Sequence, residues 1–230
     1  MRQIVLDTET TGLEPEQGHR VIEIGAVELI DRELTGETFH TYLNPQREID
    51  EGALQVHGID ADFLADKPLF GDISEALVAF IRDAELVIHN APFDVAFLNR
   101  ELSLLPGSAP RINELCKVTD SLALARHKYP GQKNSLDALC RRFDVDNSAR
   151  ERHGALLDAE ILAEVFLAMT GGQAALFTNP QEQEIEAGAG LKFEPLPAGR
   201  PRLKVVQASA QELAEHERMM AVIAASSATP

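Results

Sequence analysis

Strand-like apolar runs come first and then alternate with helix-like amphipathic segments over roughly the first 170 residues, and this order most limits the folds open to the chain. The strand-like runs cover residues 4–7, 21–29, 34–43, 85–89 and 115–118. Asp31-Arg32-Glu33 separates the second run from the third, which predicts a β-hairpin. Because the later runs alternate with helices, we expect an α/β domain: a mixed five-stranded sheet with helices on both faces.

Helix-like periodicity follows the hairpin. The segments with apolar residues at three- and four-residue spacing are 73–82, 92–104, 121–127, 135–143 and 156–169. Asp72 stands where it would cap the first helix, and Pro92 stands at the first position of the second.

The periodic pattern ends at Thr170-Gly171-Gly172, which is a helix stop signal, so we predict one domain over residues 1–172. Residues 178–200 are rich in Gln, Glu, Gly, Ala and Pro, and this composition predicts a flexible linker. Patterns typical of ordered structure return over residues 201–224, and the part from Gln211 onwards is helix-like. This segment is too short to bury a core alone, so we expect it to fold on a partner.

The 230 residues carry a formal net charge of −16, which argues against binding of nucleic acid or anionic membrane through bulk positive charge. This charge does not exclude an enzyme that binds phosphates through bound cations. The net-basic stretch is 100–152, with 10 Lys and Arg against 7 Asp and Glu, whereas residues 1–99 hold 6 against 20. Its Arg126-His127-Lys128 cluster and Lys133 are candidate contacts for a polyanion; a solvated helix face would give the same pattern.

Hydrophobic residues make up 44% of the chain, which is enough for a substantial core. The two cysteines, Cys116 and Cys140, are too few for a disulfide framework or a zinc cluster. No apolar run approaches membrane-spanning length, and the segment from Met1 to Asp7 turns acidic too soon for a signal peptide. We therefore expect a soluble protein of the cytoplasm.

Two acidic motifs follow predicted strands. Asp7 and Glu9 end the first strand and point to the same face, because side chains alternate along a strand. Such carboxylates repel each other unless a cation such as Mg²⁺ or Mn²⁺ lies between them. Asp94 follows the fourth strand, and α/β folds bind ligands at the carboxyl ends of strands. Solvated acids, or a carboxylate near the first-turn amides of its own helix, would explain these positions without a ligand.

A third acid, Asp158, lies beside the apolar stripe of its predicted helix, where an unpaired carboxylate is costly. His153 is five residues earlier, and on a continuous helix it would diverge from Asp158 by roughly 140°. Gly154 permits the helix to begin after His153, so that the two side chains can converge.

Each motif is a weak signal alone, but together they place four carboxylates and one histidine at strand ends and helix starts of one domain. This set matches two-metal phosphoryl hydrolysis, in which one cation activates a water and the other stabilises the leaving oxygen. His153 would accept the proton of the water near neutral pH. No serine elbow, P-loop lysine motif or His-Glu-x-x-His motif competes as an explanation.

These motifs resemble those of the DEDDh exonuclease superfamily and, within it, the proofreading epsilon subunits of bacterial DNA polymerase III. The matching segments are 7–12, 89–94 and 153–158, with further likeness at 116–121 and 134–140. The resemblance is strong over roughly residues 1–172. In the tail, the arrangement of segments is similar, but the residues are less so. It implies a ribonuclease H-like fold, His153 as the general base, and two divalent cations, Mg²⁺ or Mn²⁺. The residues it implies as metal ligands are Asp7, Glu9, Asp94 and Asp158.

The resemblance also implies contacts with substrate and partners. The residues expected at the 3′ end of DNA are Asp7, Glu9, Thr10, Thr11, His57 and Asp158. Residues 173–177 resemble the peptide by which replication proteins bind the sliding clamp, through Gln173, Leu176 and Phe177; a capped helix end is the alternative. Residues 201–230 resemble the segment that binds the polymerase (alpha) subunit. Some relatives bind a further small core subunit through the nuclease domain.

The leading interpretation is a 3′-to-5′ DNA exonuclease that proofreads within the bacterial replicase and releases nucleoside monophosphates. A DEDDh ribonuclease that trims small RNAs or oligoribonucleotides would share every catalytic residue, but the linker and terminal segment argue against it. A non-catalytic bridge between polymerase and clamp is a third reading, against which the complete acid set and His153 argue. Association with a polymerase separates the first reading from the second, and metal-dependent nucleotide release separates the first from the third.

Overall fold

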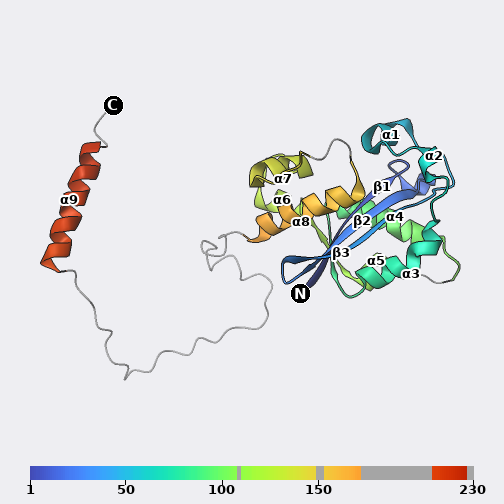
Figure 1. Cartoon of the computed structure of the whole chain (residues 1–230), viewed down its shortest axis with the longest axis horizontal. Helices are drawn as coiled ribbons and strands as arrows, with labels where there is room; N and C mark the ends of the chain where they lie inside the picture. The colour runs from blue at the N-terminus through green and yellow to red at the C-terminus, as the bar shows by residue number, and fades with distance from the viewer. Residues whose placement is uncertain (108–109, 149–152, 172–208, 227–230) are drawn as a thin grey trace, which may run out of the picture. The chain divides into compact units, whose positions relative to one another are not determined.

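The computed structural model describes residues 1–107, 110–148, 153–171 and 209–226, and the chain divides into two compact units after Thr178. A five-stranded sheet forms the centre of the first unit (Figure 1). In sheet order, the strands are β3 (Glu33–Tyr42), β2 (Val21–Ile30), β1 (Arg2–Thr10), β4 (Glu85–Ile88) and β5 (Lys117–Asp120). β1–β2 and β2–β3 are antiparallel pairs, whereas β1–β4 and β4–β5 are parallel, so the predicted mixed sheet is confirmed.

The β2–β3 hairpin turns at Asp31 and Arg32, whose φ angles of 50° and 72° are those of a tight two-residue hairpin turn. β1 is longer than the sequence predicted, because it continues past Asp7 to Thr10. Within the ladder, Glu9 is the cross-strand partner of Glu23 on β2. The first acidic motif is therefore held by strand pairing rather than by a loop.

Helices cover both faces of the sheet, as predicted (Figure 1). One face is covered by α3 (Phe70–Ile81), α4 (Ala91–Ser103) and α5 (Ile112–Leu115), and the other by α6 (Ser121–Lys128), α7 (Leu136–Phe143) and α8 (Ala155–Gly171). Alternation along β1 sends Ile4 and Leu6 into the first core and Val5 into the second. Asp7 and Glu9 follow Val5 by two and four residues, so they point to the same face of the sheet as Val5, which is the face that α8 covers.

Helical segments that the sequence did not predict are all short: η1 (Pro15–Gln17), α1 (Glu51–His57), α2 (Ala61–Leu64) and α5. They have too few turns to show a helical period in the sequence. α1 matters most for the site, because it lies against the end of β1. The backbone amide of Asp50, its N-terminal flanking residue, donates to the carbonyl of Thr11 at 2.9 Å. At its other end, His57 is buried and Gly58 adopts a left-handed conformation with a φ of 72°.

The start of α8 lies directly on β2. A Cβ atom at Gly25 would fall 2.1 Å from the backbone nitrogen of Leu156 and 2.2 Å from the carbonyl carbon of Ala155. These partners are backbone atoms, so they cannot move aside as a side chain would. Gly25 therefore allows the first turn of α8, with Asp158 in it, to approach the sheet at the level of the acidic motif on β1.

The second unit contains one described helix, α9 (Ala210–Ser226), which confirms the helix predicted from Gln211. Ser209 and Glu212 form a reciprocal cap at its start: the Ser209 amide donates to the Glu212 carboxylate at 2.7 Å, and the Glu212 amide donates to the Ser209 hydroxyl at 3.3 Å. Leu213 and Met219 are more than half exposed. Among the described residues, no helix is both long and apolar enough to cross a membrane.

We predict that Gly25→Ala lowers the free energy of unfolding by about 2 kcal/mol or more, because the added methyl group must push the start of α8 away from β2. Thermal denaturation measures this change. Gly52→Ala is the matched control, since a Cβ atom there meets nothing within 4 Å. Equal melting temperatures for the two variants would contradict the proposed seating of α8.

Candidate active site

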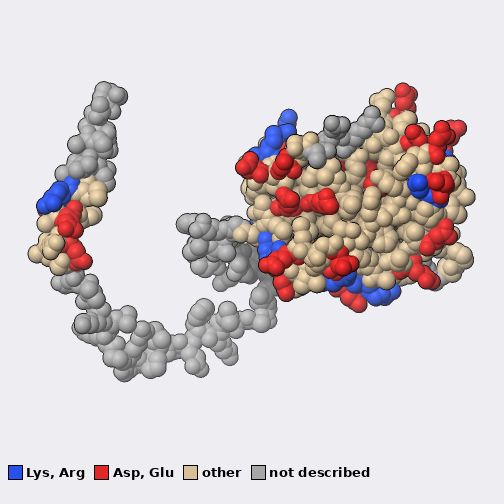
Figure 2. Space-filling view, viewed as in Figure 1, with Lys and Arg blue, Asp and Glu red and all other residues tan. Residues whose placement is uncertain are grey.

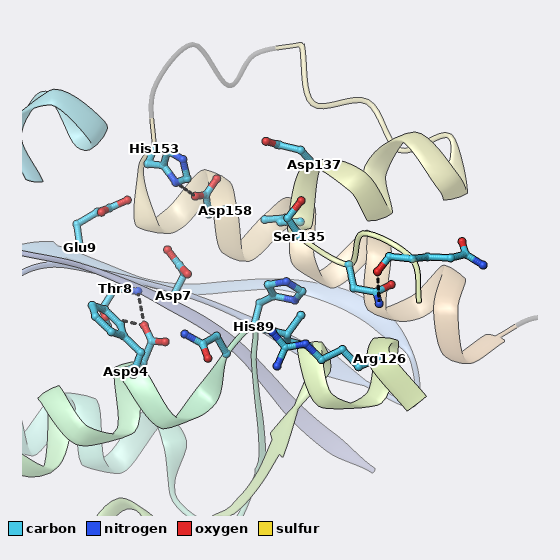
Figure 3. Close-up of a pocket in the computed structure, with 16 residues that line it drawn as sticks. Asp7, Thr8, Glu9, His89, Asp94, Arg126, Ser135, Asp137, His153 and Asp158 are labelled. Atoms are coloured by element: carbon cyan, nitrogen blue, oxygen red, sulfur yellow. Dashed lines mark hydrogen bonds and ion pairs between the residues drawn. The ribbon is translucent and has the colours of Figure 1, made fainter. Parts of the chain in front are cut away.

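A hollow of about 590 Å³ opens at the carboxyl ends of β1 and β4, where α4 and α8 approach from opposite faces of the sheet (Figure 3). The five residues predicted to be catalytic or metal-binding all line it: Asp7, Glu9, Asp94, His153 and Asp158. They come from β1, from α4, from α8 and from the segment just before α8. The structure therefore brings together side chains that are up to 151 positions apart in the sequence.

Asp94 is held against β1 from the far face of the sheet. Its Oδ1 atom accepts hydrogen bonds from the backbone amide of Thr8 at 3.1 Å and from the hydroxyl of Thr8 at 2.7 Å (Figure 3). Asn90 adopts a left-handed conformation that turns the chain from β4 into α4. Burial raises the pKa of Asp94 well above its ordinary value, although the hydrogen bonds from Thr8 oppose this rise.

Glu9, His153 and Asp158 form the tightest part of the site. Each offers one ligand atom, and the three atoms lie within 4.8 Å of one another. His153 Nδ1 lies 3.1 Å from Asp158 Oδ2, so the two side chains converge as the sequence predicted. Burial raises the pKa of Glu9 to about 8; His153 opposes the rise, and neighbouring carboxylates add to it.

Glu23 holds the start of α8 in place, a role that the sequence analysis missed. One oxygen of its buried carboxylate accepts a hydrogen bond from the backbone amide of Ala155 at 3.1 Å. The other oxygen lies 2.8 Å from Nε2 of His40 on β3. His153 is two residues before Ala155 and Asp158 is three residues after it. By holding the Ala155 amide, Glu23 therefore fixes the backbone from which both side chains extend. A glutamate inside an apolar strand run was the available sequence signal.

A second hollow, of about 490 Å³, adjoins the first, and Thr8, Glu9 and Phe93 line both. Its further lining includes the half-exposed Val56 and the highly exposed Leu13, together with Thr10 and His57. The ring of His57 is fixed because its Nδ1 accepts a hydrogen bond from the Ile59 amide at 3.0 Å.

Thr11, which was also expected at the substrate, lines neither hollow. It is fully buried, and its hydroxyl accepts a hydrogen bond from the backbone amide of Arg20 at 3.0 Å and lies 3.1 Å from Nδ1 of His19. In this structure its side chain therefore supports the turn that follows β1. The tail residues Gln173, Leu176 and Phe177 lie outside the described part of the chain.

The donor set fits hard divalent cations. Carboxylate oxygens dominate it, with one imidazole beside them, and such cations prefer oxygen ligands. Burial raises the pKa values of Glu9 and Asp94, which is an imbalance toward the neutral forms of these two acids. A bound cation would remove that imbalance.

Comparison with known proteins places the chain in a family. The profile of the exonuclease family matches residues 4–166. Among solved structures, exonuclease X in complex with 5′-overhanging duplex DNA has a TM-score of 0.56 and 25% sequence identity, covering 75% of this chain and 95% of that one. The chain therefore belongs to the exonuclease family, whose members use divalent metal ions.

More similar relatives narrow this class. The DNA polymerase III subunit epsilon of Salmonella typhimurium is 53% identical over 227 residues, covering 96% of this chain and 93% of the relative. The DNA polymerase III subunit epsilon of Escherichia coli K12 is 51% identical over the same length and coverage. The chain is thus a member of the DNA polymerase III epsilon subunits and a 3′–5′ exonuclease.

We predict that the metal-free protein loses stability as pH rises from 5.5 to 7.5. Because the pKa of Glu9 is about 8 in the folded state against an ordinary 4.5, the folded state binds more protons than the unfolded state in this window. Raising the pH therefore lowers the free energy of unfolding, and Asp94 acts in the same direction. Melting temperatures measured in a chelator should fall across the window, and Mg²⁺ should reduce the fall.

Glu9→Gln should flatten this dependence, since the variant has no carboxyl group there to ionise. Asp66→Asn is the control: a hydrogen bond from Lys67 lowers the pKa of this exposed carboxyl, so it titrates below the window. A Glu9→Gln variant whose melting temperature falls as steeply as that of wild type would contradict the account.

Proposed function

We propose that this chain is the proofreading 3′-to-5′ DNA exonuclease of a bacterial replicase, acting in the cytoplasm and releasing nucleoside monophosphates from a DNA 3′ end. The observation that carries the proposal is the convergence of four carboxylates and His153 on one hollow. The epsilon relatives match 96% of the chain, tail included, which favours this reading over a ribonuclease that has only the nuclease domain.

Two divalent cations, Mg²⁺ or Mn²⁺, would be held by the four acids that line the hollow: Asp7, Glu9, Asp94 and Asp158. When bound, such cations offset the charge of the phosphate, activate water and stabilise the departing oxygen. The acids are held by the strand β1, the Thr8 hydrogen bonds and the seated start of α8, so little reorganisation is needed when substrate arrives.

His153 is the residue assigned to proton transfer. In the tautomer that donates from Nδ1 to Asp158, the lone pair of the neutral ring is on Nε2, which can then accept a proton from the attacking water. The backbone amide of His153 donates to the carbonyl of Val56 at 3.4 Å, which ties the general base to α1. His57 lies at the end of the same helix.

The second hollow is assigned to the terminal nucleoside. Leu13, Val56 and Phe93 offer apolar surface to a base, and Thr10 and His57 offer polar atoms to a sugar. Glu9 lines both hollows, so the phosphodiester next to that nucleoside would lie at the acids.

The charge of the chain supports action within an assembly. Acidic side chains are spread over the visible face of the first unit, and Lys and Arg form only isolated spots there (Figure 2). Free DNA would therefore be bound weakly, and tethering to partners would supply the missing effective concentration. We assign residues 201–230 to the polymerase (alpha) subunit, because the exposed apolar side chains of α9 need a partner surface. We assign Gln173, Leu176 and Phe177 to the sliding clamp.

We predict that Asp94→Asn abolishes exonuclease activity while leaving the fold nearly intact, because the amide keeps the shape of the carboxyl but not its charge.

His153→Ala should lower turnover by about 10²- to 10⁴-fold, the usual effect of losing a general base. Release of nucleotides from a 3′-mismatched primer-template, with and without Mg²⁺, measures both effects, and matched RNA tests for a ribonuclease. Arg141→Ala, an exposed change outside both hollows, is the control. Wild-type activity in Asp94→Asn would refute the site assignment.

The tail gives a separate prediction. Deleting residues 201–230 should abolish binding to the polymerase subunit, and replacing Leu176 and Phe177 with Ala should weaken only the clamp contact. A five-residue peptide buries far less than a standard interface of about 1,600 Å², so the clamp contact should be transient. Pull-downs with each partner, together with hydrolysis of single-stranded DNA as the control, measure these effects. Full polymerase binding by the deleted chain would refute the tail assignment.

A further inference from the structure

The hollow that contains the acids continues well beyond them. Beyond the four predicted metal ligands, its wall includes His89, Arg126, Ser135 and a further acid, Asp137, all of which lie away from Glu9 and Asp94 in Figure 3. Neither the terminal nucleoside nor the scissile phosphodiester, as assigned above, occupies this end.

Arg126 is the one lysine or arginine among the described residues that line this hollow. Two other cations of the basic stretch, Lys128 and Arg142, are committed elsewhere. Lys128 Nζ donates to the carbonyl of Met169 at 2.8 Å, and Arg142 donates to Oδ1 of Asn134 and to the carbonyl of Lys133, each at 2.9 Å. The guanidinium of Arg126 is exposed and makes no hydrogen bond or ion pair with the described part of the chain.

The helix that carries Arg126 is held in place, because α6 is anchored along its length. Asp120 caps its start by accepting hydrogen bonds from the amides of Leu122 at 2.9 Å and Ala123 at 3.3 Å. Ala125 is fully buried in the core under the helix, and the Lys128 contact holds its end to α8. An uncommitted cation on such a support can bind an anion without breaking an existing contact or moving the helix.

The wall beside Arg126 is equally fixed. Asn134 is buried, and its side-chain amide donates to the carbonyls of Tyr129 at 3.2 Å and Gln132 at 3.1 Å, which closes the loop before α7. Arg142 supports this loop from behind and stacks on the ring of Tyr129 at 4.5 Å from its centroid. Gln132 and Ser135 are thereby presented to the hollow as exposed polar groups.

We propose that Arg126 binds the phosphate one nucleotide upstream of the scissile phosphodiester, so that this end of the hollow is the subsite for the penultimate nucleotide. The inference rests on the proposed function: with the terminal nucleoside in the second hollow and its phosphodiester at the acids, the strand leaves across the first hollow. Guanidinium is a good partner for a phosphodiester, because it donates two parallel hydrogen bonds to one phosphate. Arg126 is thus a substrate-binding residue in a surface whose other charges at the site are acidic.

The test compares two dinucleotide substrates, thymidylyl-thymidine with and without a 5′-phosphate, which differ only in the phosphate assigned to Arg126. For each full-length protein in Mg²⁺, the readout is the ratio of kcat/KM for the phosphorylated dinucleotide to that for the unphosphorylated one. Wild type should prefer the phosphorylated substrate by about tenfold, the scale of one charge-assisted contact. The ratio should fall to about one in Arg126→Ala and partly recover in Arg126→Lys, because lysine keeps the charge but not the two-pronged geometry.

Arg141→Ala, which removes an exposed arginine of α7 that does not line the hollow, should keep the wild-type ratio. A wild-type ratio near one, or an unchanged ratio in Arg126→Ala, would overturn the inference. In either case, hydrolysis of both dinucleotides would still support the proposed function. Wild-type protein that hydrolyses neither dinucleotide, nor longer single-stranded DNA, overturns the proposed function and the inference with it.

Discussion

Burial of several carboxylates at one point is the constraint on which the rest of the structure depends. Glu9, Asp94 and Asp158 are 8%, 3% and 3% exposed, and they come from three different elements. Burial disfavours the charged forms of Glu9 and Asp94 and raises the pKa of each, and neighbouring carboxylates add to the rise. Such a cluster persists in a folded protein when the scaffold holds it rigidly and a cation can balance it.

The scaffold meets this requirement by approaching the end of β1 from both faces of the sheet. On one face, α4 carries Asp94 to the Thr8 amide and hydroxyl. On the other, Gly25 allows α8 to come within backbone contact of β2, and Glu23 fixes its first amide. The geometry of the site is thus a consequence of strand pairing and helix packing, so substitutions that loosen α8 should affect activity even where they touch no acid.

Much of this could be predicted from sequence, because the acids stand at the ends of strong periodic patterns. The mixed sheet and the helices on both faces are confirmed. Asp7, Glu9, Asp94, His153 and Asp158 line one hollow, as the sequence led us to expect. The roles of Glu23 and Gly25 were missed, because a close approach between α8 and β2 has no local sequence period. Within the basic stretch 100–152, the sequence indicates Arg126-His127-Lys128 and Lys133 as candidate contacts, but only packing distinguishes Arg126 from cations that hold helix ends or loops.

The central claim is that the buried acids form one site for two divalent cations, and calorimetric titration with Mn²⁺ tests it most directly. The account predicts about two ions bound per wild-type chain and fewer in an Asp158→Asn variant that keeps its fold, since Asp158 is shared with His153 and lies beside Glu9. Absence of Mn²⁺ binding in wild type, or the same number of ions in Asp158→Asn, would contradict it.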